Sequence, residues 1–179
     1  MLLTPFPVII GRMKRKRPAY GVQRIVSGGQ TGVDRAALDA AIQLGIPHGG
    51  WCPKGRRAED GPIPDRYLLS EDDSPRYAAR TERNVIDSDA TLILHRGPLA
   101  GGTRLTARQA RNHGRPLKTI DLGEEVSLAS ARAWLRRHEV AVLNVAGPRE
   151  SQQPGITEQA LALLTKLFSN LSRSKHSVR

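Results

Sequence analysis

A chain of 179 residues with 39% hydrophobic residues is long enough for one domain with a sizeable core. Its one cysteine excludes an intramolecular disulfide and a cysteine-cluster metal site, and favours a reducing, cytoplasmic compartment. Most of the net charge of +11 comes from the two ends, where residues 1–24 and 170–179 hold nine Lys or Arg and no acid. We therefore expect a basic, poorly ordered arm over residues 1–23, a nearly balanced domain over 24–169, a basic tail over 170–179, and no specific nucleic-acid partner.

The first ten residues are apolar but too few to span a bilayer. Their positive cluster follows the apolar stretch, which is the reverse of a secretory signal. The sequence therefore predicts no membrane partner. The natural start could be Met1 or Met13.

From Arg24 onward, apolar strand-like runs alternate with segments of helical periodicity. In chain order we predict strand 25–27, helix 33–44, strand 46–50, helix 76–88, strand 90–95, helix 103–113, strand 116–121, helix 127–138, strand 140–145 and helix 154–167. Thr31 and Asp34 have the spacing of a capping box at the first helix. Residues 50–75 hold four prolines, as in a lid or binding loop, and only 67–69 is strand-like within them. Such alternation implies right-handed crossovers, and hence a single-domain, three-layer α/β sandwich with a mostly parallel sheet.

Three of the predicted strands end at glycine-rich turns that lead into helices: residues 28–32, 99–103 and 146–148. Glycine lets a ligand approach the backbone, and a helix start offers unpaired N–H groups and partial positive charge. In a parallel sheet these turns share the carboxyl edge, where ligands of open α/β folds bind. We interpret them as an anion-binding rim, with ordinary tight turns as the alternative.

The first turn lacks the spacing of a dinucleotide fingerprint or a P-loop, so a phosphomonoester or a single nucleotide phosphate suits it better. In the second turn, the Thr103 hydroxyl could cap the following helix and also contact a phosphate. The third turn carries polar groups stiffened by Gly147 and Pro148. The candidate binding residues on the three turns are Gly28, Gly29, Gln30, Thr31, Gly101, Gly102, Thr103, Asn144, Arg149, Glu150 and Ser151.

The long loop and the helix after it supply further candidates: Trp51, Lys54, Arg56, Arg83 and Asn84. An indole beside cations suits a flat, anionic heterocycle. Arg83 could clamp a phosphate or form a surface ion pair. Cys52 could be a soft metal ligand or a small buried residue. The sequence holds no nucleophile–base–orienter set, so we predict no catalytic residue and no metal site apart from this candidate cysteine.

Four segments resemble the family of molybdenum-cofactor carriers: IVSGGQTGVDRAA (25–37), GWCPKGRRAEDG (50–61), GGT (101–103) and NVAGPRES (144–151). The resemblance covers roughly residues 24–168. It implies a Rossmann-like fold shared with nucleotide-ligand sensors and lonely-guy-type phosphoribohydrolases, and a homo-dimer or homo-tetramer that binds the pterin-based cofactor. Those hydrolases resemble Pro-Gly-Gly-x-Gly-Thr-x-x-Glu, and here Thr106 stands where the Glu should be, so hydrolase activity is not expected.

The sequence therefore predicts non-enzymatic carriage of molybdenum cofactor or a related phosphorylated pterin. One alternative is a protein that binds a nucleotide derivative through its phosphate, or hydrolyses a nucleotide N-glycosidic bond. A further alternative is a nucleic-acid-associated protein that uses its basic tails.

Overall fold

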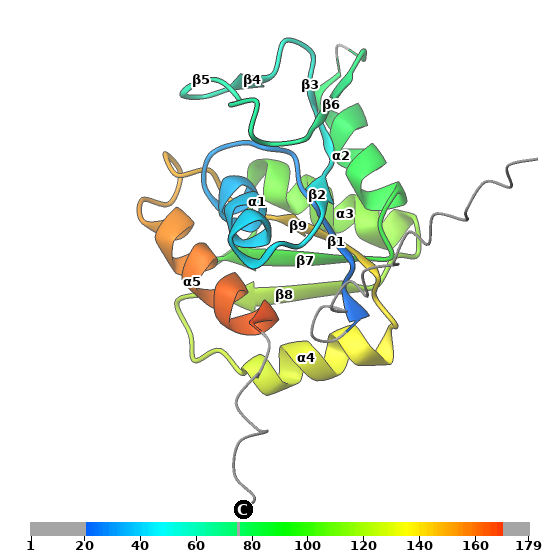
Figure 1. The fold of residues 1–179 in the computed structure, drawn as a ribbon, viewed down its shortest axis with the longest axis vertical. Helices are drawn as coiled ribbons and strands as arrows, with labels where there is room; N and C mark the ends of the chain where they lie inside the picture. The colour runs from blue at the N-terminus through cyan, green and yellow to red at the C-terminus, as the bar shows by residue number, and fades with distance from the viewer. Residues whose placement is uncertain (1–20, 75, 170–179) are drawn as a thin grey trace, which may run out of the picture.

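The computed structural model describes residues 21–74 and 76–169 and is built around a five-stranded parallel sheet (Figure 1). Its strands are β1 (Arg24–Val26), β2 (His48–Gly49), β7 (Ala90–His95), β8 (Leu117–Asp121) and β9 (Val142–Ala146). They lie in the order β2-β1-β9-β7-β8, and every neighbouring pair is parallel. Residues 1–20 of the predicted basic, poorly ordered arm (1–23) lie outside the described residues, as does the predicted basic tail (170–179). Residues 21–23 were wrongly assigned to the arm, because Val22 is buried in the core and the Gln23 N–H donates to the Ala141 carbonyl at 2.7 Å.

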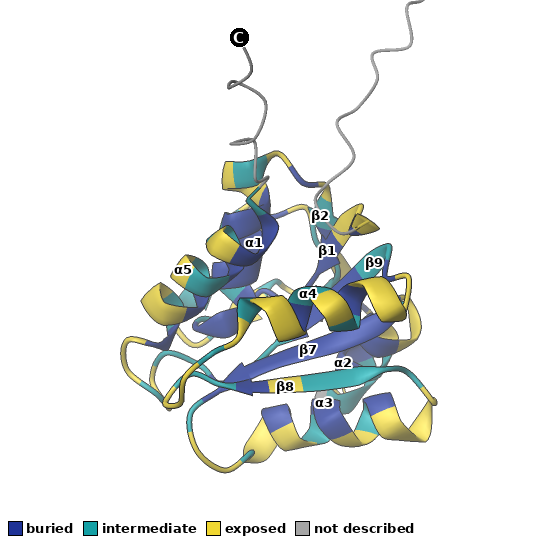
Figure 2. Cartoon of the chain, turned by 90° about the horizontal axis from the view of Figure 1, so that it is seen from below, coloured by how far each residue is buried: buried dark blue, intermediate teal, exposed yellow. Residues whose placement is uncertain are grey.

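Five helices cover the two faces of this sheet: α1 (Val33–Leu44), α2 (Tyr77–Ile86), α3 (Gly101–Asn112), α4 (Leu128–Arg137) and α5 (Ile156–Phe168). Figure 2 shows α1, α4 and α5 on one face and α2 and α3 on the other. The main core lies under the first group, where fully buried alanines of α1 let α5 approach closely. The predicted three-layer α/β sandwich is confirmed. Within the described residues, each helix is too short or too polar to cross a bilayer.

The last strand of the chain occupies the centre of the sheet. If β9 is counted first, the strand order becomes 3-2-1-4-5, which is the order of the first five strands of a Rossmann fold. Val22, just before β1, and Phe168, at the end of α5, belong to the same hydrophobic cluster. The fold is therefore a Rossmann sheet whose first strand and helix have been moved to the carboxyl end of the chain.

The segment predicted as a loop over residues 50–75 contains four short strands: β3 (Trp51–Pro53), β4 (Arg57–Ala58), β5 (Gly61–Pro62) and β6 (Ser70–Asp72). β3 pairs with β6, and β4 and β5 form an antiparallel hairpin. The strand-like run 67–69 is not a strand. Tyr67 is buried instead, packs with Leu38 and Ile63, and donates a 2.8 Å hydrogen bond to Asp39.

Both predictions of a threonine helix cap were wrong. Gly32 occupies the cap position of α1, where the Thr31 hydroxyl donates to Glu59 and Asp34 turns inward. Helix α3 begins at Gly101 and has Ala100 at its cap position, so Thr103 already lies inside the first turn of the helix. The Thr31 hydroxyl thus has its partner on the β4–β5 hairpin, and local sequence spacing does not reveal a contact of this kind.

The close contact between β9 and its neighbours predicts that Gly147 accepts no side chain. A Cβ there would overlap the Leu94 carbonyl and lie 2.5 Å from Val33 Cγ2. We expect Gly147→Ala to lower the free energy of unfolding by about 1–3 kcal/mol, measured by urea unfolding. Gly123→Ala is the control, since its Cβ would lie 3.2 Å from Asp121 Oδ1. Equal stability of the two variants would contradict the packing.

Candidate functional site

A polar cavity of about 200 Å³ opens at the carboxyl edge of the sheet, beyond the ends of β9 and β7. This is the point where the strand order reverses, and ligands of open α/β sheets bind at such switch points. The residues that line it come from all three glycine turns and from α1, α2 and α3: Gly28, Gln30, Asp34, Arg80, Thr81, Asn84, Gly102, Thr103, Thr106, Asn144, Ala146, Gly147, Arg149 and Gln152.

The start of α3 forms one wall of the cavity. Its first hydrogen bond runs from the Arg104 N–H to the Ala100 carbonyl at 3.1 Å, so the earlier N–H groups of Gly102 and Thr103 have no acceptor within the helix. Unpaired N–H groups and the helix dipole favour an anion at this position. Thr106 does not add a donor, because its hydroxyl already donates to the Gly102 carbonyl at 3.0 Å.

Asp34 and Arg80 form the floor of the cavity, and both are buried. The Asp34 carboxylate accepts hydrogen bonds from the backbone of Gly28, Gln30 and Gly147. Burial raises the pKa of Asp34 to about 6, against the opposing effect of the Arg80 guanidinium and of these hydrogen bonds. A Cβ on Gly28 would overlap Arg80 and lie 2.8 Å from Asp34 Oδ2, so the bare glycine makes room for both side chains.

The hydrogen-bond donors that the first glycine turn offers to a ligand differ from those predicted. The Gln30 N–H donates to Asp34, and the Thr31 N–H donates to Gln30 Oε1 at 3.0 Å. The Glu59 N–H donates to the same Gln30 oxygen at 2.9 Å. Two of the backbone donors expected at this turn are therefore already paired, and the Gln30 Nε2 amino group is left as its donor toward the cavity.

Seven of the predicted binding residues come together around the cavity: Gly28, Gln30, Asn84, Gly102, Thr103, Asn144 and Arg149. Asn84 also holds the neighbouring loop, since its side chain exchanges two hydrogen bonds with the backbone of Trp51. The sequence did not single out Asp34, Arg80, Thr81 or Gln152 as binding residues. Arg80, Thr81 and Asn84 share one side of α2, and this spacing is the one signal that could have grouped them.

Thr31, Glu150 and Ser151 lie around a second, shallower cavity. Glu59 from the β4–β5 hairpin accepts hydrogen bonds from Thr31 and from Ser151, whose hydroxyl lies 2.5 Å from Oε2. Glu150 accepts from the Thr157 N–H at 3.0 Å and so caps α5. These three predicted residues therefore join the hairpin and α5 to the first turn. Gly29 faces Ile63 and Leu69 instead, and Gly101 is the first residue of α3.

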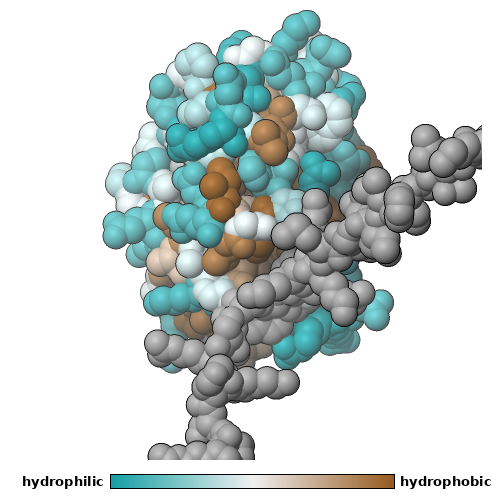
Figure 3. Space-filling model, in the orientation of Figure 1, coloured by the Kyte–Doolittle hydropathy of each residue, from teal (hydrophilic) through white to brown (hydrophobic). Residues whose placement is uncertain are grey.

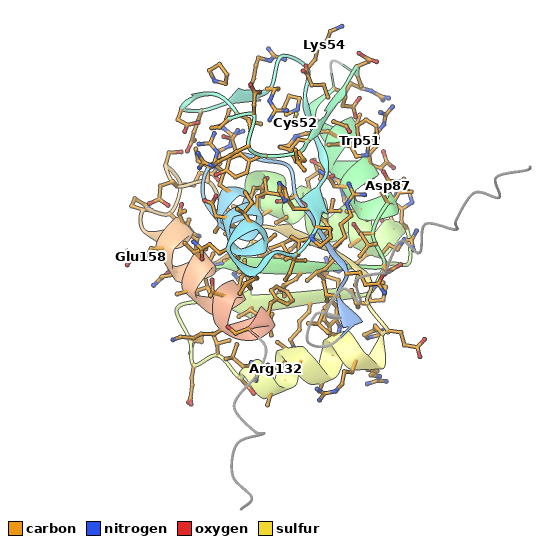
Figure 4. The ribbon with its side chains drawn as sticks, in the orientation of Figure 1. Trp51, Cys52, Lys54, Asp87, Arg132 and Glu158 are labelled. Atoms are coloured by element: carbon orange, nitrogen blue, oxygen red, sulfur yellow. The ribbon has the colours of Figure 1, made fainter. Side chains whose placement is uncertain are left out.

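Trp51 and Arg83 partner each other on the outside of the molecule. The indole Nε1 donates to Asp87 at 2.7 Å, and the Arg83 guanidinium lies 4.8 Å from the ring centroid. Figure 4 shows Trp51 and Asp87 side by side near α2. Arg83 also pairs with the buried Asp72 at 3.4 Å. Both predicted residues thus have partners within the protein and do not line the polar cavity.

The remaining predicted residues belong to the long loop. Arg56 donates to four carbonyls of this loop, those of Ile63, Pro64, Tyr67 and Leu69. Lys54 lies at the outer end of the loop, and its side chain is 71% exposed (Figure 4). Cys52 is buried in the cluster with Leu38, and burial raises the pKa of its thiol. No group of three or more His, Cys, Asp or Glu suited to a metal occurs among residues 21–74 and 76–169.

A Rossmann-like sheet with a polar cavity and glycine turns at its switch point defines a class of proteins that bind nucleotide-like ligands. Residues 25–168 match the circularly permutated YpsA SLOG family, and the chain belongs to this family. The strand order described above, with its first strand at the carboxyl end of the chain, agrees with a circular permutation.

One similar solved structure is the 1.45 Å crystal structure described as a "Putative molybdenum carrier protein" from Syntrophus aciditrophicus SB. The two sequences are 45% identical, and the match covers 86% of this chain and 98% of that one with a TM-score of 0.79. A comparison with curated proteins found no match.

The raised pKa of Asp34 predicts a specific pH dependence of stability. Between about pH 4 and pH 6 the unfolded chain loses the Asp34 proton while the folded protein keeps it, so folding stability falls as pH rises through this window. We expect Asp34→Asn to remove up to about 3 kcal/mol of this decline, measured as the difference in urea unfolding free energy between wild type and variant at each pH.

Asp65→Asn serves as the control, because the Asp65 carboxylate is fully exposed. It should keep the wild-type pH dependence. If Asp34→Asn keeps it as well, the folded protein does not hold the Asp34 proton in this window.

Proposed function

We propose that this protein binds a small phosphorylated ligand in the switch-point cavity and carries it without chemical turnover. The observation that carries the proposal is the convergence of the α3 start, the Thr103 hydroxyl and two arginines, Arg80 and Arg149, on one polar cavity. Such donors fit a phosphate group with its charge, and arginines match phosphate oxygens in geometry.

Among ligands of this chemistry we propose the molybdenum cofactor or a related phosphorylated pterin. Support comes from the 45% identical structure that is described as a molybdenum carrier. Within the cavity, Gln30 Nε2 and Gln152 offer hydrogen bonds to a polar heterocycle. Trp51 is not proposed as the stacking residue, because it lies against Arg83 and Asp87.

Carriage suits this cavity better than hydrolysis of a nucleotide. Asp34 is the one carboxylate among the described residues that line it, and its oxygens accept hydrogen bonds from three backbone groups. Thr106 donates to its own helix and offers no carboxylate for acid–base work. Mass spectrometry and fluorescence of compounds released from the purified protein distinguish the two: an oxidised-pterin signal supports carriage, and turnover of a nucleoside monophosphate overturns it.

The phosphate position is tested by Gly102→Val. The residue is exposed at the first turn of α3, so the fold should survive, while the branched side chain blocks access to the N–H groups. We expect loss of binding of the released compound and of inorganic phosphate, measured by calorimetry.

A matched pair of arginines tests the charge at the same site. Arg149 lines the cavity and Arg108 lies on the exposed side of α3. Arg149→Gln should weaken phosphate affinity by roughly 10- to 150-fold, the value of one charged hydrogen bond, whereas Arg108→Gln should change it little. If the Gly102 variant stays folded with full affinity, the phosphate binds elsewhere.

We also propose that the protein forms a homo-dimer or homo-tetramer through the face that carries α1. Figure 3 shows hydrophobic residues gathered near the centre of this face within a hydrophilic surround. Ile42 is 42% exposed and Leu68 is 68% exposed. Light scattering of the wild type should give a multiple of the chain mass. Leu68→Glu should reduce this mass, whereas the control Ile86→Glu on α2 should leave it unchanged. A monomeric wild type contradicts the proposal.

A further inference from the structure

The positive charge of the described domain is concentrated in one part of the chain. Residues 90–120, which span β7, α3 and most of β8, hold six Lys or Arg and no Asp or Glu. The rest of residues 21–169 holds 14 basic and 17 acidic side chains. The basic character of the domain therefore comes from α3 and the residues beside it.

Three arginines of α3, Arg104, Arg108 and Arg111, follow one another at spacings of four and three and so share one side of the helix. All three are exposed, whereas Thr106, Ala107 and Ala110 on the opposite side of the helix are buried. Figure 2 shows the exposed side of α3 turned away from the sheet. We call these three residues the α3 arginine stripe.

The stripe is not neutralised within the domain. Among residues 21–74 and 76–169, no hydrogen bond or ion pair engages the guanidinium of Arg104, Arg108 or Arg111. The nearby carboxylate of Glu82 is paired with His113 at 2.7 Å. Like charges spaced in this way destabilise a helix slightly, so the domain itself gains nothing from the stripe.

The stripe also extends beyond the reach of a small ligand. Arg108 and Arg111 lie roughly 7.5 and 12 Å along the helix axis from Thr103, at about 1.5 Å per residue. A ligand seated in a cavity of about 200 Å³ does not reach both. A partner that contacts the whole stripe must itself have an extended surface.

We propose that the α3 arginine stripe docks an acidic protein surface, such as a helix with carboxylates at matching spacing. Charge complementarity favours such a partner. A nucleic acid fits less well, because α3 contains no aromatic residue on which bases could stack. A phosphate backbone laid across α3 and the neighbouring α2 would also meet the carboxylate of Glu82, which lies against His113 at the end of α3. The proposal does not depend on which ligand the cavity holds.

The test uses the full chain and a fluorescent helical peptide that carries three glutamates at spacings of four and three. Binding is measured by anisotropy at low ionic strength, where surface charges are least screened. Arg108→Glu with Arg111→Glu should weaken peptide affinity at least about tenfold, because two attractions become repulsions. Arg57→Glu with Arg137→Glu makes the same change of net charge at exposed sites elsewhere and should have a much smaller effect.

Equal weakening by the two double variants, or none by the stripe variant, overturns the proposal. Tighter, stripe-dependent binding of a short DNA duplex also overturns it, in favour of a nucleic acid. The affinity for inorganic phosphate is measured in parallel on the wild type and the stripe variant. The two proteins should give the same result, whether or not the wild type binds phosphate. A failure of the cavity proposal is thereby separated from a failure of this one.

Discussion

The buried carboxylate of Asp34 connects the parts of the site that come from opposite ends of the chain. It accepts from the backbone of Gly28 and Gln30 after β1 and of Gly147 after β9, and Arg80 from α2 lies beside it. A carboxylate buried this far is tolerated only where hydrogen bonds and a cation compensate for lost water. Both turns and α2 must therefore be in place together, and the cavity is the space that they enclose.

The elements of the fold follow from local pattern. Alternation of apolar runs with helical periodicity predicted the five strands of the main sheet and all five helices, and the three-layer arrangement follows from the crossovers. The central place of β9 does not follow, because pairing between β9 and β1 depends on residues far apart in sequence. The short strands of residues 50–75 depend on similar long-range pairing, as between Trp51 and Ser70.

The candidate site was predicted best where topology alone brings residues together. Gly28, Gly102 and Asn144 meet because the carboxyl ends of parallel strands share one edge. Trp51 and Arg83 were assigned to the ligand from residue type, but Asp87 and Asp72 satisfy them within the protein. Arg80 was not predicted as a binding residue. Packing against α3 decides which side of α2 faces inward, and the polar sequence of α2 does not specify that side.

The central position of β9 also constrains how the chain can fold. The Ser27 hydroxyl bonds to the Val145 carbonyl across 118 residues of sequence. During synthesis, β1 and β7 emerge early but have no strand between them until residues 142–146 leave the ribosome. Contacts of such sequence separation slow folding, and strand edges left open in the meantime expose the chain to aggregation. A ribosome-bound chain that has reached only β8 therefore holds two separate halves of a sheet, and the final strand joins them.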